Sequence, residues 1–229
     1  LSDQDVLNLI IRRPKLKFPP GDQFRYSNTG YCVLALIVQK VSGISFAEYV
    51  KENLFKPINI QEGLIYTPQS KIVDRAFGYH PIRSKYLYAD QSITSATQGD
   101  GGAYLSQAEI QKWCNFITYS ISTDSVYRNL HNNGMKVNHS VSYQLGLFKI
   151  TDENKNIHLF HSGESTGFQN ILYIDVNNDL CITILTNRDD FIISKMFDEL
   201  LSFYGRNLVM QKNLGKSTFI WLSDVYMGY

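Results

Sequence analysis

Residues 18–31 read FPPGDQFRYSNTGY, and this stretch is the most informative part of the chain. Its FPPG portion cannot continue a helix and predicts a turn. From about residue 29 to residue 41 apolar side chains run almost continuously, which predicts a helix that is buried on most sides and that ends at Ser42 and Gly43. Because Ser and Asn favour helix starts, Tyr26, Ser27 and Asn28 could by themselves be no more than an N-terminal cap.

Helices are predicted on both sides of this stretch. Ser2 and Asp5 form a capping-box pattern before apolar residues at helical spacing. A second helix is expected from about residue 46 to Pro57, and a third after Ser106, with Glu109 at its third position. Residues 60–98 are rich in Tyr, Ser and Pro with little periodicity, which indicates long loops of the kind that border a cleft.

The last third of the chain changes to strand-like patterns. Residues 143–150, 157–161, 168–176 and 180–186 have this character, and short polar connectors separate them. Short connectors imply antiparallel pairing. Asp189 or Asp190 would then cap a closing helix. Helices first and a sheet later predict an α+β fold, an antiparallel sheet flanked by helices with a helical, loop-rich subdomain.

Composition limits the classes of partner. The 229 residues carry a formal charge of +1, so no overall field attracts nucleic acid or an acidic membrane. No apolar run reaches the roughly 18 residues of a membrane span. Cys32, Cys114 and Cys181 each lie in an apolar run, which predicts buried free thiols rather than a disulfide or a metal site. We therefore expect no cofactor and no metal.

Several short motifs occur in an order and spacing that resemble one enzyme family. Tyr26 and Asn28 form a Tyr-x-Asn motif, residues 99–106 (GDGGAYLS) form a glycine-rich turn before a helix, and residues 161–163 (HSG) begin a third motif. Together they are similar to the penicillin-binding-protein-like serine hydrolases, which include class C β-lactamases, D-alanyl-D-alanine peptidases and esterases. The resemblance covers roughly residues 1–205. Residues 206–229 lie outside it as an extension of unknown role.

The resemblance implies an acyl-transfer site. Tyr26 and His161 would be its catalytic residues, with Tyr26 sharing in the proton transfers and His161 on the leaving-group or carboxylate side. Acyl transfer also needs donors for an oxyanion and a polar anchor for the substrate amide. The implied substrate-binding residues are Asn28, Ser162, Gly163 and Glu164, the last through its backbone N–H. The substrate would be a small molecule or peptide with an amide, ester or lactam bond, and the motifs do not distinguish a lactamase from a peptidase or an esterase.

The family's nucleophile is missing from the printed sequence. Members carry it in a Ser-x-x-Lys motif, yet no lysine here has a serine three positions before it. We expect that motif upstream of Leu1, so the domain would be N-terminally incomplete and this chain alone inactive. Without the lysine, Tyr26 should keep its proton, because a free tyrosine has a pKa of about 10. The alternative is a catalytically inactive homologue that binds a peptide or a peptidoglycan-like ligand.

Two rival patterns carry less weight. Residues 163–167 (GESTG) match the Gly-x-Ser-x-Gly nucleophile elbow, but a strand-like run follows where an elbow needs a helix, and no histidine follows Ser165. His158 and His161 would face opposite sides of a strand, so a shared metal is not expected. Oligomeric state stays open. Localisation also stays open, although the resemblance leans towards an extracytoplasmic protein.

Overall fold

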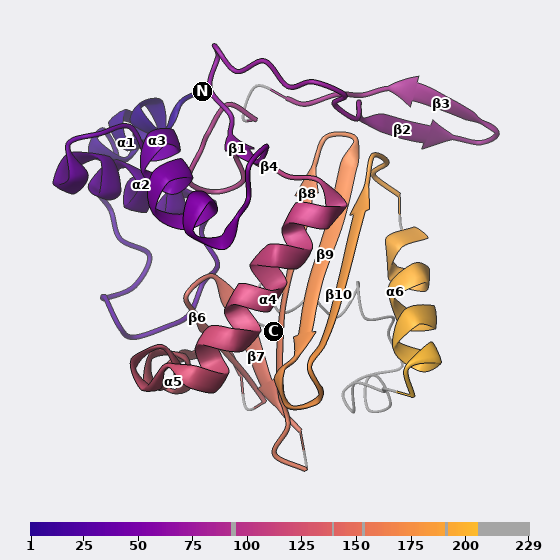
Figure 1. Ribbon diagram of the computed structural model, residues 1–229. Helices are drawn as coiled ribbons and strands as arrows, with labels where there is room; N and C mark the ends of the chain where they lie inside the picture. The colour runs from indigo at the N-terminus through magenta and orange to yellow at the C-terminus, as the bar shows by residue number, and fades with distance from the viewer. Residues whose placement is uncertain (93–94, 139, 153, 191, 206–229) are drawn as a thin grey trace.

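A computed structural model describes residues 1–92, 95–138, 140–152, 154–190 and 192–205. It confirms the α+β architecture predicted from the sequence. A six-stranded antiparallel sheet has the strand order β10-β9-β8-β7-β6-β5 (Figure 1). The strands are β5 (Met135–Lys136), β6 (Val141–Gln144), β7 (Leu147–Thr151), β8 (Ile157–Ser165), β9 (Phe168–Asp175) and β10 (Leu180–Thr186). The predicted extension, residues 206–229, lies outside the described residues.

Helices cover both faces of this sheet. Helix α4 (Gln107–Thr123) packs on one face, where Leu159 and Ile174 contribute to the core. Helix α6 (Ile192–Phe203) packs on the other, against Phe160 and Tyr173 (Figure 1). Successive residues of a strand point to opposite faces, so each strand supplies both cores. The short helix α5 (Ser125–Asn132) joins α4 to the sheet.

The helical subdomain precedes the sheet in the chain. It consists of α1 (Asp3–Ile11), α2 (Asn28–Ser42) and α3 (Phe46–Val50), followed by the short turns η1 (Lys51–Phe55) and η2 (Lys56–Ile58). The predicted caps are confirmed. Ser2 and Asp5 form the capping box of α1, Gly43 ends α2 in the left-handed conformation at φ 76°, and Ser106 starts α4 with Glu109.

The prediction that α2 is buried on most sides is wrong. Cys32 and Ala35 are its buried residues, whereas Leu34, Ile37 and Val41 expose 52%, 51% and 82% of their surface. The reason is that, in the part of the chain that is described, α2 packs against α1 and α3 and leaves another face uncovered. An apolar pattern shows that a face tends to be covered, but it does not show what covers it.

Residues 60–98 are mostly loops, as predicted, with three short strands among them. Strand β1 (Leu64–Ile65) pairs with β4 (Ala103–Tyr104). Strands β2 (Tyr79–Ile82) and β3 (Lys85–Tyr88) form a hairpin that projects beyond the end of the large sheet (Figure 1). Backbone bonds from Tyr79 to Asn187 and from Gln91 to Thr166 tie this hairpin to the ends of the long strands.

The cysteine prediction is wrong for two of the three residues. Cys114 and Cys181 form a disulfide, with their Cα atoms 6.3 Å apart, and only Cys32 is a buried free thiol. The pair could not be found from sequence spacing, because 67 positions separate the two cysteines. They meet because α4 packs over β10.

Among the described residues, no single helix has the length and apolar composition needed to cross a membrane. The segments Asn28–Ser42 and Phe46–Ile58 reach that composition only when taken together, and they are bent by 80° relative to each other.

Candidate active site

Tyr26 and His161 lie side by side although 135 positions separate them in the sequence. Tyr26 immediately precedes the cap of α2, and His161 lies on β8. Their ring centroids are 5.8 Å apart. Phe148 of β7 packs against both rings, with centroid distances of 6.4 Å to Tyr26 and 5.9 Å to His161. The fold therefore brings together the two residues that the sequence predicts to be catalytic.

The environment of Tyr26 favours its neutral phenol. Burial raises the pKa of Tyr26 to about 12, and the neighbouring Tyr31 and the carboxylate of Asp100 add to this increase. At neutral pH the hydroxyl is therefore protonated and can donate a hydrogen bond, but it cannot act as a base. This agrees with the expectation that Tyr26 keeps its proton in this chain.

His161 is also neutral at pH 7. Burial lowers the pKa of its imidazole to about 4, and a hydrogen bond with the backbone of Ser162 offsets only part of that decrease. A neutral imidazole cannot supply the positive charge that would lower the pKa of Tyr26.

A pair of tyrosines that the sequence analysis did not select supports Tyr26. The hydroxyl groups of Tyr31 on α2 and Tyr143 on β6 are 2.5 Å apart. The ring of Tyr143 meets that of Tyr26 edge to face at a centroid distance of 6.1 Å. This contact joins the helical subdomain to the sheet where Tyr26 lies. Tyr31 ends the FPPGDQFRYSNTGY stretch and could have been considered, whereas Tyr143 had no distinguishing signal.

Ser27, rather than Asn28, caps helix α2. The Ser27 hydroxyl accepts a hydrogen bond of 3.1 Å from the backbone N–H of Gly30. Asn28 is the first residue of α2 and is exposed. Within the described part of the chain its side-chain amide forms no hydrogen bond, so the capping interpretation does not account for Asn28.

The predicted substrate-binding residues of the HSG motif lie where β8 extends past β7. The ladder between β7 and β8 ends at the pair Phe148 and Phe160. The ladder between β8 and β9 continues to Ser165. Gly163 and Glu164 therefore lie beyond the end of β7, and Glu164 is exposed. An extended ligand could add to a strand edge of this kind through backbone hydrogen bonds.

The nucleophile-elbow interpretation of residues 163–167 does not hold. Strand β8 ends at Ser165, and after a two-residue turn strand β9 begins at Phe168. The segment joins two antiparallel strands, as the sequence predicted, whereas an elbow requires a helix after the serine. Gly167 allows the turn because its φ is 81°.

The glycine-rich turn at residues 99–102 carries Asp100, whose carboxylate is near enough to help raise the pKa of Tyr26. The carboxylate of Asp3 accepts hydrogen bonds from the backbone N–H groups of Gln98 and Gly99, at 3.1 to 3.3 Å, and so holds the turn against α1. Asp3, Cys32 and Asp100 place their possible ligand atoms within 4.8 Å of one another. Burial raises the pKa of Cys32 to about 12, so its thiol is protonated there. The absence of a metal centre stays a prediction.

His158 points away from His161 into the core. Its ring bonds to the Tyr173 hydroxyl at 2.9 Å and to the Asp152 carboxylate at 3.3 Å. These contacts agree with the expectation that the two histidines do not share a metal.

Comparison with known proteins places these features in a family. The sequence profile described as Beta-lactamase matches residues 2–195, which is most of the chain. The chain belongs to the beta-lactamase family. In the curated sequences it is 24% identical over 208 residues to penicillin-binding protein 4* of Bacillus subtilis, covering 82% of this chain and 45% of that protein. It is also 23% identical over 191 residues to protein flp of Staphylococcus aureus, covering 81% of this chain and 38% of the relative. The chain thus spans less than half the length of these curated relatives.

Solved structures share the fold of this beta-lactamase family member. A penicillin-binding protein from Bacillus halodurans superposes with a TM-score of 0.71 at 20% identity, covering 87% of this chain and 62% of that one. An octameric penicillin-binding protein homologue from Pyrococcus abyssi gives 0.73 at 20% identity, covering 90% and 48%. D-amino acid amidase from Ochrobactrum anthropi, in a complex with L-phenylalanine amide, gives 0.67 at 18% identity, covering 82% and 56%.

Proposed function

We propose that this chain is the larger part of a serine hydrolase site that forms and hydrolyses an acyl-enzyme on an amide, ester or lactam. The observation that carries the proposal is the contact between Tyr26 and His161, with ring centroids 5.8 Å apart, beside the end of β8. Membership of the beta-lactamase family and the fold shared with an amidase support the same reaction class.

The nucleophilic serine and its lysine would come from a Ser-x-x-Lys segment outside the 229 residues. The printed sequence contains no such motif. Two features could receive the segment. The exposed apolar side chains of α2, including Leu34 and Val41, offer a wall for a packed helix. In the sheet that the structure describes, β10 pairs with β9 alone and so presents an edge to which a further strand could add.

The raised pKa of Tyr26 indicates that the lysine would have to favour the phenolate form of this residue. At about 12 the phenol holds its proton, and a base that works near pH 7 needs a pKa lower by about 5, which corresponds to about 7 kcal/mol. A lysine ammonium at a few ångströms is the kind of charge that favours the phenolate, although one charge supplies only part of this energy. Tyr26 would therefore relay a proton between serine, lysine and leaving group rather than exist as a free phenolate.

The remaining roles follow from position. Asn28, exposed at the start of α2, would hydrogen-bond the amide of the substrate. Gly163 and Glu164, beyond the end of β7, would offer backbone groups to the substrate and to the oxyanion. His161 and Ser162, on the same strand, would contact the leaving-group side as a neutral imidazole and a hydroxyl.

Hydrolysis of a chromogenic ester and a chromogenic lactam tests the proposal. The 229-residue chain should show no turnover above a Tyr26→Phe control. The chain joined to a Ser-x-x-Lys segment, in one polypeptide or added separately, should turn over, and Tyr26→Phe should then reduce kcat by about 10²- to 10⁴-fold. Ser165→Ala serves as the matched control and should leave the rate unchanged.

The runner-up is an inactive homologue that retains the site to bind a peptide or a peptidoglycan-like ligand. The lack of Ser-x-x-Lys in the printed sequence is the observation in its favour. The two proposals differ in the coding sequence upstream of Leu1. A degenerate replacement for Ser-x-x-Lys there, with measurable peptide binding and no turnover, would favour the binding protein.

A further inference from the structure

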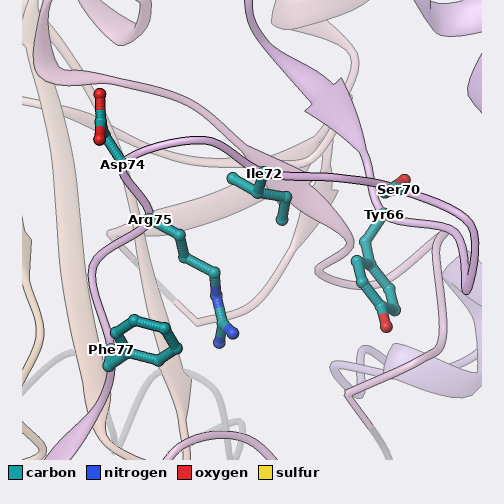
Figure 2. A pocket seen from close by; sticks show the side chains of 6 residues that line it. All are labelled: Tyr66, Ser70, Ile72, Asp74, Arg75 and Phe77. Atoms are coloured by element: carbon teal, nitrogen blue, oxygen red, sulfur yellow. The ribbon is translucent and has the colours of Figure 1, made fainter.

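A pocket of about 470 Å³ lies in the loop between β1 and β2, and none of its residues belongs to the site described above. Figure 2 shows the side chains that line it. They are Tyr66, Ser70, Ile72, Asp74, Arg75 and Phe77. Two aromatic rings and one aliphatic side chain give the pocket apolar surface, polar groups line a slightly larger share of its wall, and Arg75 brings a permanent positive charge. This mixed composition suits a small ligand that carries both an apolar group and a polar or negatively charged group.

The guanidinium of Arg75 points into the space between Phe77 and Tyr66, whereas the carboxylate of Asp74 points away from it (Figure 2). Aromatic rings hold the guanidinium in place. It lies 5.0 Å from the ring centroid of Phe77 and 5.7 Å from that of Tyr104. Such stacking fixes the plane of the guanidinium before any ligand binds, which reduces the entropy lost on binding.

Asp90 engages only part of the hydrogen-bonding capacity of Arg75. The Nη2 atom of Arg75 donates to Asp90 at 2.5 Å, and the Nε atom is buried without an acceptor in the described part of the chain. Asp90 also accepts from the backbone N–H of Gly78 at 2.8 Å and from the Tyr88 hydroxyl at 3.4 Å. The carboxylate thus shares its charge among three donors. A guanidinium has five N–H groups, and the hydrogen bonds of Arg75 to Asp90 and to the Tyr104 phenol do not occupy all of them, so a donor remains for a second carboxylate.

The pocket adjoins the candidate active site through two turns. Gly78 follows the pocket residue Phe77, and a Cβ atom on Gly78 would lie 3.0 Å from the Cα of Gly167 in the turn after β8. On the other side, the backbone N–H of Tyr66 donates to the carbonyl of Gly102 at 2.7 Å. Gly102 belongs to the glycine-rich turn, in which the carboxylate of Asp100 raises the pKa of Tyr26. A substrate that extends past Glu164 would therefore run towards Arg75.

We propose that this pocket binds a carboxylate that adjoins an apolar group of the substrate, with Arg75 as the residue that determines specificity. The proposal deepens the proposed hydrolase function and rests on it for the identity of the ligand as substrate. The Arg75 side chain keeps 21% of its surface exposed, and its accessible N–H groups that are not bonded to Asp90 receive the carboxylate. The rings of Tyr66 and Phe77 pack against the apolar group. Substrates that lack the acid should lose this anchor.

Binding of phenylacetate and of its neutral analogue phenylacetamide to the 229-residue chain tests the proposal by two-dimensional amide NMR. Phenylacetate should bind with a Kd on the order of 1 mM, with saturable shifts at Tyr66, Arg75 and Phe77. Phenylacetamide should bind at least about tenfold more weakly, because it lacks the charge that the guanidinium recognises. Added salt should weaken phenylacetate binding more than phenylacetamide binding.

Variants of Arg75 and Lys71 test which residue binds the carboxylate. Arg75→Gln combined with Asp90→Asn removes both charges, so no buried carboxylate is left unpaired, and should weaken phenylacetate binding at least about tenfold. Lys71→Gln is the matched control, since Lys71 is an exposed cation in the same loop and does not line the pocket. It should change the Kd less than about twofold.

Equal affinity for the acid and the amide in the unaltered chain would overturn the proposal without any variant. Amide chemical-shift changes confined to residues outside the pocket would also overturn it. The same would follow if Lys71→Gln lost as much affinity for phenylacetate as Arg75→Gln with Asp90→Asn. The measurement needs no nucleophile, so its failure would leave the hydrolase function standing. Conversely, a chain that binds phenylacetate at Arg75 but stays inactive after a Ser-x-x-Lys segment is joined to it would refute the hydrolase function and leave the carboxylate site.

Discussion

Acidification from pH 7 to pH 4 should destabilise this protein through the imidazole of His161. Burial lowers the pKa of His161 from the ordinary 6.5 to about 4, so the folded chain favours the neutral ring while the unfolded chain takes up a proton near pH 6.5. The contribution to stability is therefore complete above about pH 6.5 and is lost as the pH falls towards 4. The difference between the two pKa values corresponds to about 3 kcal/mol of unfolding free energy.

A pair of measurements checks this magnitude. Proton NMR titration should give one histidine Cε1–H resonance that titrates near pH 4, and the His161→Gln variant should lose that resonance, which assigns it among the five histidines. Between pH 7 and pH 4, urea unfolding should show that the unfolding free energy of His161→Gln falls by about 3 kcal/mol less than that of the unaltered protein, because a neutral amide has no proton to gain.

A His161 pKa of 6 or above would contradict this explanation. The explanation would also be refuted if the unaltered protein and His161→Gln lost the same unfolding free energy between pH 7 and pH 4. Either result would mean that water or an anion reaches the imidazole, so that its contact with Tyr26 is not the buried one described here.

Two further predictions concern stability. Gly167→Ala should lower the unfolding free energy, measured with urea, by about 3 kcal/mol, because φ is 81° and the new Cβ atom would collide with the carbonyl of Ala89. Gly43→Ala, with φ 76° and no atom within 4 Å, should lower it by only about 1 kcal/mol. Equal losses in the two variants would contradict the steric explanation. Thiol titration of the unreduced, denatured protein should find one free thiol, and three free thiols would rule out the disulfide. The double variant Cys114→Ala with Cys181→Ala should lower the unfolding free energy by up to about 4 kcal/mol, because the disulfide joins residues 67 positions apart.

Local sequence rules predicted the features that depend on neighbouring residues. Ser2 with Asp5 and Ser106 with Glu109 form the expected capping boxes, because both partners lie within one helical turn. Gly43 ends α2 as expected, since a left-handed residue suits glycine. The antiparallel order of the later strands also followed from local alternation and short connectors. Residues 143–150, predicted as one strand, instead belong to β6 and β7, because Leu145 and Gly146 form a turn with positive φ between them.

Features that depend on distant residues could not be predicted in this way. The disulfide joins Cys114 to Cys181, which become neighbours only when α4 lies across the sheet. The exposure of Val41 depends on what packs on α2, and an apolar pattern contains no information about that. In the candidate site, the motifs selected Tyr26 and His161. Tyr143 was not selected, because it lies beside Tyr26 only as a result of the strand order in the sheet.

The most direct test of the central claim is to find the residue that becomes acylated. A fluorophosphonate probe should leave the 229-residue chain unlabelled. When the sequence encoded upstream of Leu1 is joined to the chain, peptide mass spectrometry should locate the label on the serine of a Ser-x-x-Lys motif, and Tyr26→Phe should slow labelling by about 10²-fold or more. Rapid labelling of the 229-residue chain at Ser165, unchanged by Tyr26→Phe, would contradict the account.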